Sequence, residues 1–356
     1  MIMNDNLVLE KEANVPLVTI VTITYNLIEK KREACIKQCI ESVHDQTYPC
    51  IEHLIIDGAS NDGTLELLGQ YQKQGSIEIV SEADEGIYDA MNKGIARAKG
   101  KYINFLNSDD FFHNNKAVEM SVRALEEKHA DYSFADAMLL FENGKEYLWE
   151  GDVSKLLWGS HYCHQTMFVR TELMRAIGGF DLSYKISADT EMMIRLYAQK
   201  ALYVKVPFSI VTYRVGGYSS QNQAQSRMDH SAAFYKHIGM KIGLSEKDCF
   251  FCWNLRFFDE LSKEQQFELI SKVPREYGLK HLLHEFMART YAGSEVSAKL
   301  YYLFGFVPVL KCKCRGNKRY FRLFGVLPVL KVVKSVRKDK YYLFGFILML
   351  KVKRYM

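Results

Sequence analysis

The stretch LVTIVTITY, from Leu17 to Tyr25, is a run of apolar and β-branched residues. Such a run is typical of a strand that is buried on both faces of a parallel sheet. Three more strands of this kind are indicated, at Ile51 to Ile56, Ile77 to Val80 and Tyr102 to Leu106. Helical patterns separate the strands, at Glu29 to His44, from Thr64 onward, and at Ile87 to Ala98. This alternation predicts an α/β fold with a mostly parallel, Rossmann-like sheet, right-handed crossovers and flanking helices.

Polar residues follow each of these four strands or the turn after it. The clusters are Thr24-Tyr25-Asn26, Asp57-Gly58, Glu82 to Asp84 and Asn107 to Asp110. In open α/β sheets, ligands bind beyond the carboxyl ends of the strands. The four clusters therefore predict a ligand site along one edge of the sheet.

The chain has 356 residues, enough for one large domain or two modest ones with a core. Residues Val296 to Met356 hold 15 Lys and Arg against one acid, whereas the remainder holds 32 basic and 41 acidic residues. The net charges of these two parts are thus +14 and −9. The asymmetry indicates an acidic body with a functionally separate basic tail.

Neither export nor a membrane span is expected from the sequence. Met1 to Glu12 lacks the basic start and apolar run of a secretory signal, and no apolar stretch approaches the ~18–20 residues that cross a bilayer. We therefore expect a cytoplasmic protein. Cys249 and Cys252 form one C-x-x-C without the second ligand pair that a zinc site needs, so reduced core cysteines are the better interpretation.

The acid motif, Asn107-Ser108-Asp109-Asp110, has adjacent carboxylates at the end of a buried strand. Two such groups repel each other and lose solvation unless a cation or solvent reaches them. Oxygen ligands of this kind suit Mg²⁺ or Mn²⁺, with substrate phosphates completing the coordination shell. The alternative is a polar turn in which an Asp caps the segment that follows.

Two further positions have both functional and structural interpretations. Asp57 precedes a Gly-rich turn, where a carboxylate can accept hydrogen bonds from a ribose or base, or close an Asx-turn. Asp89 and Asn92 share one face of a predicted helix, where the amide could bind substrate hydroxyls. Acids in this region also favour a helix N-terminus through the helix dipole.

Several motifs occur in order and with natural spacing between Pro16 and Ser220. They are VTIVTITYN, QTYPCIEHLIIDGASNDGT, SEADEGIYDAMNKGIARAKGKYINFLNSDD, HQTMFVRTELMRAIGGFD and ISADTEMMIRL. Together they resemble the inverting family 2 glycosyltransferases of GT-A fold, in the branch associated with bacterial O-antigen, capsule and lipopolysaccharide biosynthesis. The resemblance implies transfer of a sugar, with inversion, from a nucleotide-sugar to a saccharide or lipid-linked saccharide acceptor. A UDP-sugar is the expected donor.

The resemblance also implies a role for each matching residue. Asp189 matches the general base of the family, with Glu191 as the second candidate. Asn107-Ser108-Asp109 occupies the position of the Asp-x-Asp metal motif, and because Asn107 is neutral, Asp109 becomes the main ligand of Mn²⁺ or Mg²⁺. The implied donor-binding residues are Thr24, Tyr25, Asn26, Asp57, Gly58, Asp84, Asp89, Asn92, Asn107 and Ser108. Further candidates are Asp110, and, on the acceptor and diphosphate side, His164 and Arg214.

The expected organisation has four parts. They are a nucleotide-sugar-binding half at 15–125, an acceptor-binding half at 126–228, a helical extension at 229–295 and a basic tail of repeats at 296–356.

The tail repeats one motif at an offset of twenty residues, as Tyr301 to Lys311, Phe321 to Lys331 and Tyr341 to Lys351. Each copy is too short to cross a bilayer, but aromatic residues next to Lys and Arg suit its headgroup boundary. We expect peripheral binding to the anionic inner face of the cytoplasmic membrane. Nucleic acid is not expected, because the aromatics are not interleaved with the charges. The alternative is that the repeats fold back onto the catalytic domain or pair between subunits.

Two rival functions have signatures of their own. A nucleotidyltransferase on a similar sheet needs a Gly-rich phosphate loop with Lys or Arg after the first strand, which Thr24-Tyr25-Asn26-Leu27 is not. A catalytically weak, membrane-bound scaffold of the same fold is indicated by loss of Asp109 or Asp189, and both are present. The sequence therefore favours an active transferase.

Overall fold

The computed structural model describes residues 15–153, 156, 162–217, 222–254 and 260–273, together with six strands between 298 and 352. It separates into two compact units, divided in the sequence between Asn254 and Leu255. The first unit holds every candidate site residue named above. The division falls inside the helical extension expected at 229–295, and the expected border at 295/296 lies outside the described residues.

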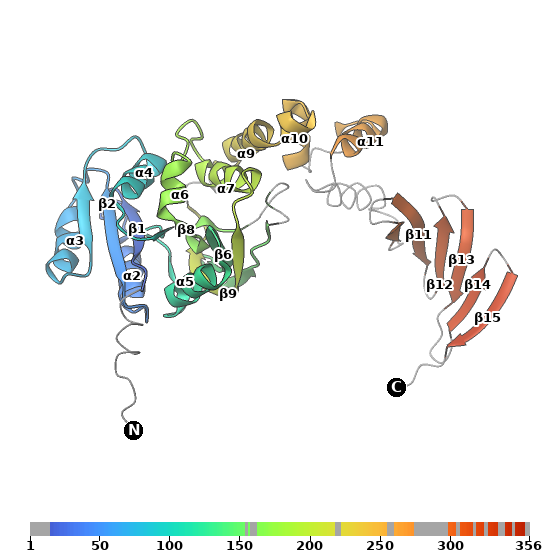
Figure 1. The fold of residues 1–356 in the computed structure, drawn as a ribbon, viewed down its shortest axis with the longest axis horizontal. Helices are drawn as coiled ribbons and strands as arrows, with labels where there is room; N and C mark the ends of the chain where they lie inside the picture. The colour runs from blue at the N-terminus through green and yellow to red at the C-terminus, as the bar shows by residue number, and fades with distance from the viewer. Residues whose placement is uncertain are drawn as a thin grey trace, which may run out of the picture. The chain divides into compact units, whose positions relative to one another are not determined.

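The first unit contains one nine-stranded sheet with helices packed against it (Figure 1). Its four leading strands are β1 (Val18–Thr24), β2 (Ile51–Asp57), β3 (Glu78–Ser81) and β4 (Tyr102–Phe105). They pair in parallel in the order β3-β2-β1-β4, which confirms the parallel arrangement predicted for these segments. Their carboxyl ends therefore lie at one edge of the sheet.

The other half of the sheet is mixed. It continues from β4 with β8 (Phe168–Arg170), β6 (Tyr132–Leu140), β9 (Tyr203–Arg214) and β5 (Phe111–Phe112), and β7 (Glu146–Trp149) pairs with β6. β8 is antiparallel to both β4 and β6, whereas β6 and β9 are parallel. β8 begins only at Phe168, because His164–Thr166 forms the 3₁₀ turn η2.

Helices cover the sheet and complete the first unit. They are α2 (Glu33–His44), α3 (Thr64–Lys73), α4 (Ile87–Arg97), α5 (Ala117–Lys128), α6 (Thr171–Ala176), α7 (Ala188–Ala198), α9 (Gln223–His237), η3 (Gly239–Ile242) and α10 (Glu246–Trp253). α2 buries Ile36, Ile40 and Val43, the face expected from their spacing. The helix expected from Glu29 starts only at Glu33, since Lys31 has a positive φ of 55° that interrupts a helical path.

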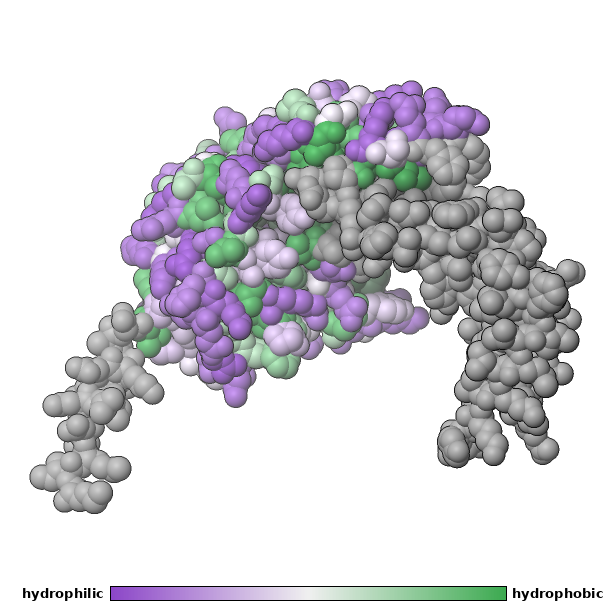
Figure 2. Space-filling model, turned by 45° about the vertical axis from the view of Figure 1, so that its right-hand side comes forward, coloured by the Kyte–Doolittle hydropathy of each residue, from purple (hydrophilic) through white to green (hydrophobic). Residues whose placement is uncertain are grey.

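β1 lies at the centre of the core. Val18 and Ile20 are fully buried and belong to one apolar cluster with residues of α2, α5 and β4. Burying such a side chain contributes roughly 1.5–3 kcal/mol, so the apolar run that opens the sequence is a main source of stability. On the face shown in Figure 2, hydrophilic residues cover much of the first unit and apolar ones form small, separate patches.

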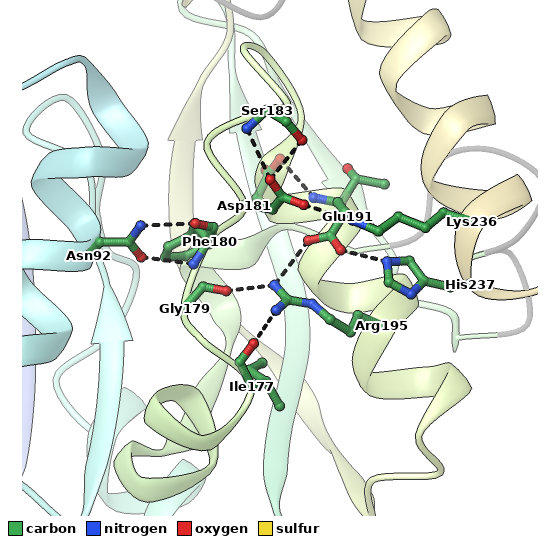
Figure 3. A network of polar contacts seen from close by, with 12 residues as sticks. Asn92, Ile177, Gly179, Phe180, Asp181, Ser183, Glu191, Arg195, Lys236 and His237 are labelled. Carbon is green, nitrogen blue, oxygen red and sulfur yellow. Dashed lines mark hydrogen bonds and ion pairs between the residues drawn. The ribbon is translucent and has the colours of Figure 1, made fainter.

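A buried polar network fixes α9 and the turn after α6 to α7 (Figure 3). Glu191 of α7 is 1% exposed, accepts a hydrogen bond from Arg195 at 3.0 Å and lies 2.6 Å from Nε2 of His237 in α9. Arg195 also donates to the backbone carbonyls of Ile177 and Gly179. Glu191 therefore has its own charge partners inside the protein.

The second unit contains α11 (Lys263–Lys272) and a six-stranded antiparallel sheet. The strands follow chain order as β10 (Ala298–Leu303), β11 (Val307–Arg315), β12 (Lys318–Leu323), β13 (Leu327–Val333), β14 (Asp339–Leu343) and β15 (Phe346–Val352). The repeat reappears in the register, since Leu310 pairs with Leu323 and Leu330 pairs with Leu343. In the described part of the chain, no helix is both long and apolar enough to cross a membrane.

We expect Glu191→Gln to lower the free energy of unfolding by about 3–5 kcal/mol, the usual cost of breaking a buried ion pair. The substitution leaves the Arg195 side chain, which is 13% exposed, without its counter-charge. Asp181→Asn is the control, because the Asp181 side chain is 30% exposed and that of its partner Lys236 is 50% exposed, so this ion pair should be worth under about 1 kcal/mol. Chemical denaturation measures both losses. Equally small losses would contradict the structural role of Glu191.

Candidate active site

Asp57 ties together the carboxyl ends of three parallel strands. Its fully buried carboxylate accepts hydrogen bonds from Thr24 Oγ1 (3.0 Å) and Ser81 Oγ (2.8 Å). It also accepts from the hydroxyl (2.5 Å) and the backbone N–H (2.9 Å) of Ser60. Both carboxylate oxygens are thus engaged, and Asp57 shapes the edge of the sheet without facing solvent.

Three of the expected donor-binding residues form an open cluster next to the end of β2. Tyr25 is 53% exposed, and Lys30 Nζ lies 4.8 Å from the centroid of its ring. Gly58 leaves room for Asp84, since a Cβ at position 58 would lie 2.5 Å from Asp84 Oδ2. The Gly86 N–H donates to the other Asp84 oxygen at 2.9 Å. This nucleotide corner, as we call it, offers an aromatic face and a carboxylate to a ligand.

Three other expected donor-binding residues form hydrogen bonds with other segments of the protein. Asn26 has a φ of 47°, and its side-chain oxygen accepts from the loop after β2 at 3.2 Å. Asp89 accepts from the Glu85 N–H at 3.0 Å near the start of α4, and this hydrogen bond lowers the pKa of Asp89. The Asn92 amide accepts from the N–H of Phe180 (2.8 Å) and donates to its C=O (2.9 Å; Figure 3). The amide expected to meet substrate hydroxyls thus clamps a backbone segment.

The acid motif places its two carboxylates in different environments. Asp109 is 19% exposed, and Arg32 Nη1 donates to its Oδ2 at 2.8 Å. Asp110 is buried and accepts from Gln165 Nε2 at 2.7 Å and from the Arg214 N–H at 2.9 Å. Burial, and then the charge of Asp109, raises the pKa of Asp110. Asp109 is therefore the carboxylate of the motif that a ligand can reach.

Arg214, at the end of β9, packs against the acid motif. Its guanidinium donates to the backbone carbonyl of Asp109 and to Gln38 Oε1 (2.5 Å). The same group lies over the Phe111 ring, 5.0 Å from the centroid. The guanidinium groups of Arg32 and Arg214 thus both contact Asp109, one at the side chain and one at the backbone.

Asp189, near the start of α7, is surrounded by hydrogen-bond donors. His164 Nδ1 lies 3.0 Å from its Oδ2, and the Thr190 N–H donates to its Oδ1 at 2.8 Å. The Tyr88 hydroxyl shares its single proton between this Oδ1 (3.1 Å) and the Ile186 carbonyl (2.7 Å). Burial by itself would raise the pKa of Asp189, but the hydrogen bond and charge of His164 outweigh burial and lower that pKa to about 2. An ionised carboxylate only accepts, so His164 Nδ1 holds a proton. Asp189 is thus ionised at neutral pH, and its side chain is 24% exposed.

A buried chain of hydrogen bonds connects this pair to the acid motif. Asn104 in β4 donates to the backbone carbonyls of Gln165 (2.8 Å) and Met167 (2.7 Å), and Gln165 in turn holds Asp110. His164 directly precedes Gln165 in η2, so the same contacts fix its position. The two carboxylate centres predicted from the sequence are therefore linked by buried hydrogen bonds.

Three residues of the site were missed by the sequence analysis, namely Arg32, Tyr88 and Asn104. Asn104 had a usable signal, because a polar residue inside an apolar strand needs a buried partner. Arg32 and Tyr88 had none, since their partners lie 77 and 101 residues away along the chain. Conversely, Glu191 lies in the buried network of Figure 3 and is not among the partners of Asp189.

The chain is similar to known proteins over the region that carries this site. A family model described as Glycosyl transferase family 2 matches residues 19–192. A PGL/p-HBAD biosynthesis glycosyltransferase of Mycobacterium tuberculosis is 28% identical over 201 residues, covering 55% of this chain and 75% of that protein. An uncharacterised glycosyltransferase of the same organism is 34% identical over 185 residues, covering 51% of this chain and 68% of that protein.

The fold also has a counterpart among solved structures. Residues 1–349 of S. aureus TarS, in complex with UDP-GlcNAc, match with a TM-score of 0.52 at 14% identity, over 80% of this chain and 94% of that chain. This likeness confirms the GT-A fold, in which helices flank a curled central sheet. The sequence matches show in addition that the chain belongs to glycosyl transferase family 2 and is a glycosyltransferase.

Proposed function

We propose that this enzyme transfers a sugar from a UDP-sugar to a saccharide or lipid-linked saccharide acceptor, with inversion, in the assembly of a bacterial surface glycan. The observation that carries the proposal is the Asp189 carboxylate. The hydrogen bond and charge of His164 keep this carboxylate ionised, its side chain is 24% exposed, and buried hydrogen bonds link His164 to the acid motif. A relative named for a biosynthetic glycosyltransferase supports a biosynthetic role.

The donor nucleotide is proposed to bind at the nucleotide corner. The exposed Tyr25 ring can stack on a base, and the Asp84 carboxylate can accept hydrogen bonds from ribose hydroxyls or from a base N–H. Gly58 keeps the backbone close to Asp84 because it has no side chain in the way. Asp57 and Asn26 act indirectly in this proposal, by fixing the strand ends and the loop on which the corner is built.

A divalent cation, Mn²⁺ or Mg²⁺, is proposed to bind at Asp109. Asp109 Oδ1 and the Asn107 side chain have no partner among the described residues, so both oxygens are open to an ion. No group of three His, Cys, Asp or Glu side chains is arranged for a metal in the part of the chain described, so donor phosphates must supply other ligands, as is usual for Mg²⁺. The ion would neutralise charge on the departing diphosphate.

Asp189 is the proposed general base. An acceptor hydroxyl that attacks the anomeric carbon from the side opposite the diphosphate inverts the configuration, so a single base is sufficient. A carboxylate with a pKa of about 2 is a weak base. It takes the proton only when the bond between the acceptor oxygen and the anomeric carbon is forming, because that bond makes the hydroxyl more acidic. His164 and Tyr88 are proposed to hold the carboxylate in the orientation that meets that hydroxyl.

We expect Asp189→Asn to lower turnover by about 10²–10⁴-fold, the usual contribution of a positioned general base, while UDP affinity is unchanged. Asparagine keeps the shape of the side chain but cannot take the proton. Transfer assays with UDP-, GDP- and dTDP-sugars and calorimetric titration with UDP separate the two effects. Asp181→Asn, which removes an acid outside the site, is the control. Wild-type turnover in the Asp189 variant would place the base elsewhere.

We also propose that the basic tail holds the enzyme at the anionic inner face of the cytoplasmic membrane. Residues 296–356 have a net charge of +14, whereas the rest of the chain has −9, so attraction to anionic lipid must come from the tail. The aromatic repeats suit the headgroup boundary and add a share of binding that salt does not screen. The proposed association is therefore peripheral.

Truncation after Ser294 should abolish sedimentation with anionic vesicles, because the remaining chain is net negative. The full chain should bind and be partly released at high salt, since the Debye length falls to ~3 Å at molar ionic strength. Equal binding by both proteins would assign the membrane contact to the catalytic unit. Sedimentation of the full chain without vesicles would instead indicate self-association, for which β10 and β15 are the outer strands of the described tail sheet.

A further inference from the structure

The Asp109 carboxylate already has a cationic partner in this structure. Arg32 Nη1 lies 2.8 Å from Asp109 Oδ2. Arg32 is the N-terminal cap residue of α2, its side chain is 39% exposed, and it has no other side-chain partner among the residues described. A single, partly exposed contact therefore holds the guanidinium on this oxygen, and such contacts contribute little to stability.

Two guanidinium groups gather around Asp109. Arg214 donates to the Asp109 backbone carbonyl, so two guanidinium groups lie within hydrogen-bonding distance of one residue. The adjacent Asp110 is buried, and its two oxygens accept hydrogen bonds from Gln165 Nε2 and the Arg214 N–H, so it is engaged inside the protein. Before a donor binds, a metal ion that approaches Asp109 therefore meets a carboxylate that is already paired with one guanidinium and has a second guanidinium at its backbone.

We infer that Arg32 is an exchangeable cation that neutralises Asp109 in the free enzyme and moves to the donor diphosphate when the donor binds, which releases Asp109 to the divalent ion. The inference rests on the metal and donor sites proposed above. A guanidinium matches phosphate oxygens in a two-pronged geometry, so the diphosphate is a stronger partner for Arg32 than a partly solvated carboxylate. The metal ion and Arg32 therefore compete for the single negative charge of Asp109, although Arg32 contacts only Oδ2.

Two consequences distinguish this role from a simple surface ion pair. In the free enzyme, Arg32 should weaken metal binding, because the guanidinium already neutralises the carboxylate that the ion would bind. With UDP present, Arg32 should strengthen nucleotide binding and free Asp109 at the same time. Metal and nucleotide therefore bind cooperatively, and the cooperativity depends on one side chain.

The test measures Mn²⁺ binding to the full chain by the paramagnetic resonance of free Mn²⁺, with and without UDP, and UDP binding without metal by calorimetry. For Arg32→Gln we expect Mn²⁺ alone to bind about tenfold more tightly and UDP alone about tenfold more weakly, within the usual range of coupling between two ligands. UDP should then tighten Mn²⁺ binding less than in the wild type. Arg32→Lys should keep more of the UDP affinity than Arg32→Gln. Lys37→Gln, an exposed cation of the same helix that pairs with Glu41, should change neither affinity.

Opposite shifts of the two affinities in Arg32→Gln support the exchange. Unchanged or weaker Mn²⁺ binding in Arg32→Gln, in a protein whose UDP complex still binds Mn²⁺, overturns the role of Arg32 and leaves the metal proposal standing. Absence of Mn²⁺ binding in wild type and variant, even with UDP, overturns the metal assignment at Asp109 and this inference with it.

Discussion

The hydrogen bond from Gln165 Nε2 to Asp110 Oδ2, 2.7 Å long, joins the two halves of the site. Asp110 follows β4, the last of the parallel strands, whereas Gln165 lies in η2, ahead of the antiparallel β8. Asn104, inside β4, donates a second hydrogen bond to the same segment, at the backbone carbonyl of Gln165. A buried carboxylate without such donors would be strongly destabilising, so the segments after β4 and before β8 must pack together. His164 directly precedes Gln165, so its placement, and through it the orientation of Asp189, depends on these hydrogen bonds.

The hydrogen bond between Gln165 and Asp110 also explains why the acid motif offers one carboxylate to a ligand and not two. Adjacent acids in a partly buried position cannot both stay charged at low cost. Asp110 is drawn into the interior, while Asp109 keeps contact with solvent and with a cation. A similar division occurs on α7, where Asp189 and Glu191 are two residues apart and therefore about 200° apart around the helix. One faces the site, and the other lies in the buried network with α9.

The parallel half of the sheet, and the edge at which its polar strand ends gather, could be predicted because both follow from local sequence. Apolar runs mark buried strands, and polar residues at their ends mark the ligand edge. Hydrogen-bond partners could not be predicted in this way. Asp57, Asn92 and Glu191 bond to residues 33, 88 and 46 positions away, so the fold alone decides whether they face a ligand or the interior. The strand pairing in the mixed half of the sheet could not be predicted for the same reason, since β8 pairs with two strands distant in sequence.

Each acid of the site has a partner before any ligand arrives: Asp109 has Arg32, Asp110 has Gln165 and Asp189 has His164. The guanidinium groups of Arg32 and Arg214 gather at Asp109, whereas Asp189 supplies a carboxylate elsewhere in the same site. In glycosyl transfer the acceptor hydroxyl loses a proton while negative charge grows on the departing diphosphate. The reaction therefore needs a proton acceptor on one side and positive charge on the other. Charges that are fixed before the reaction stabilise a transition state without reorganising. In the proposed mechanism the guanidinium groups at Asp109 serve the diphosphate and Asp189 serves the acceptor hydroxyl, so the pairs that balance charge in the free enzyme also prepare the positions that the ligands occupy.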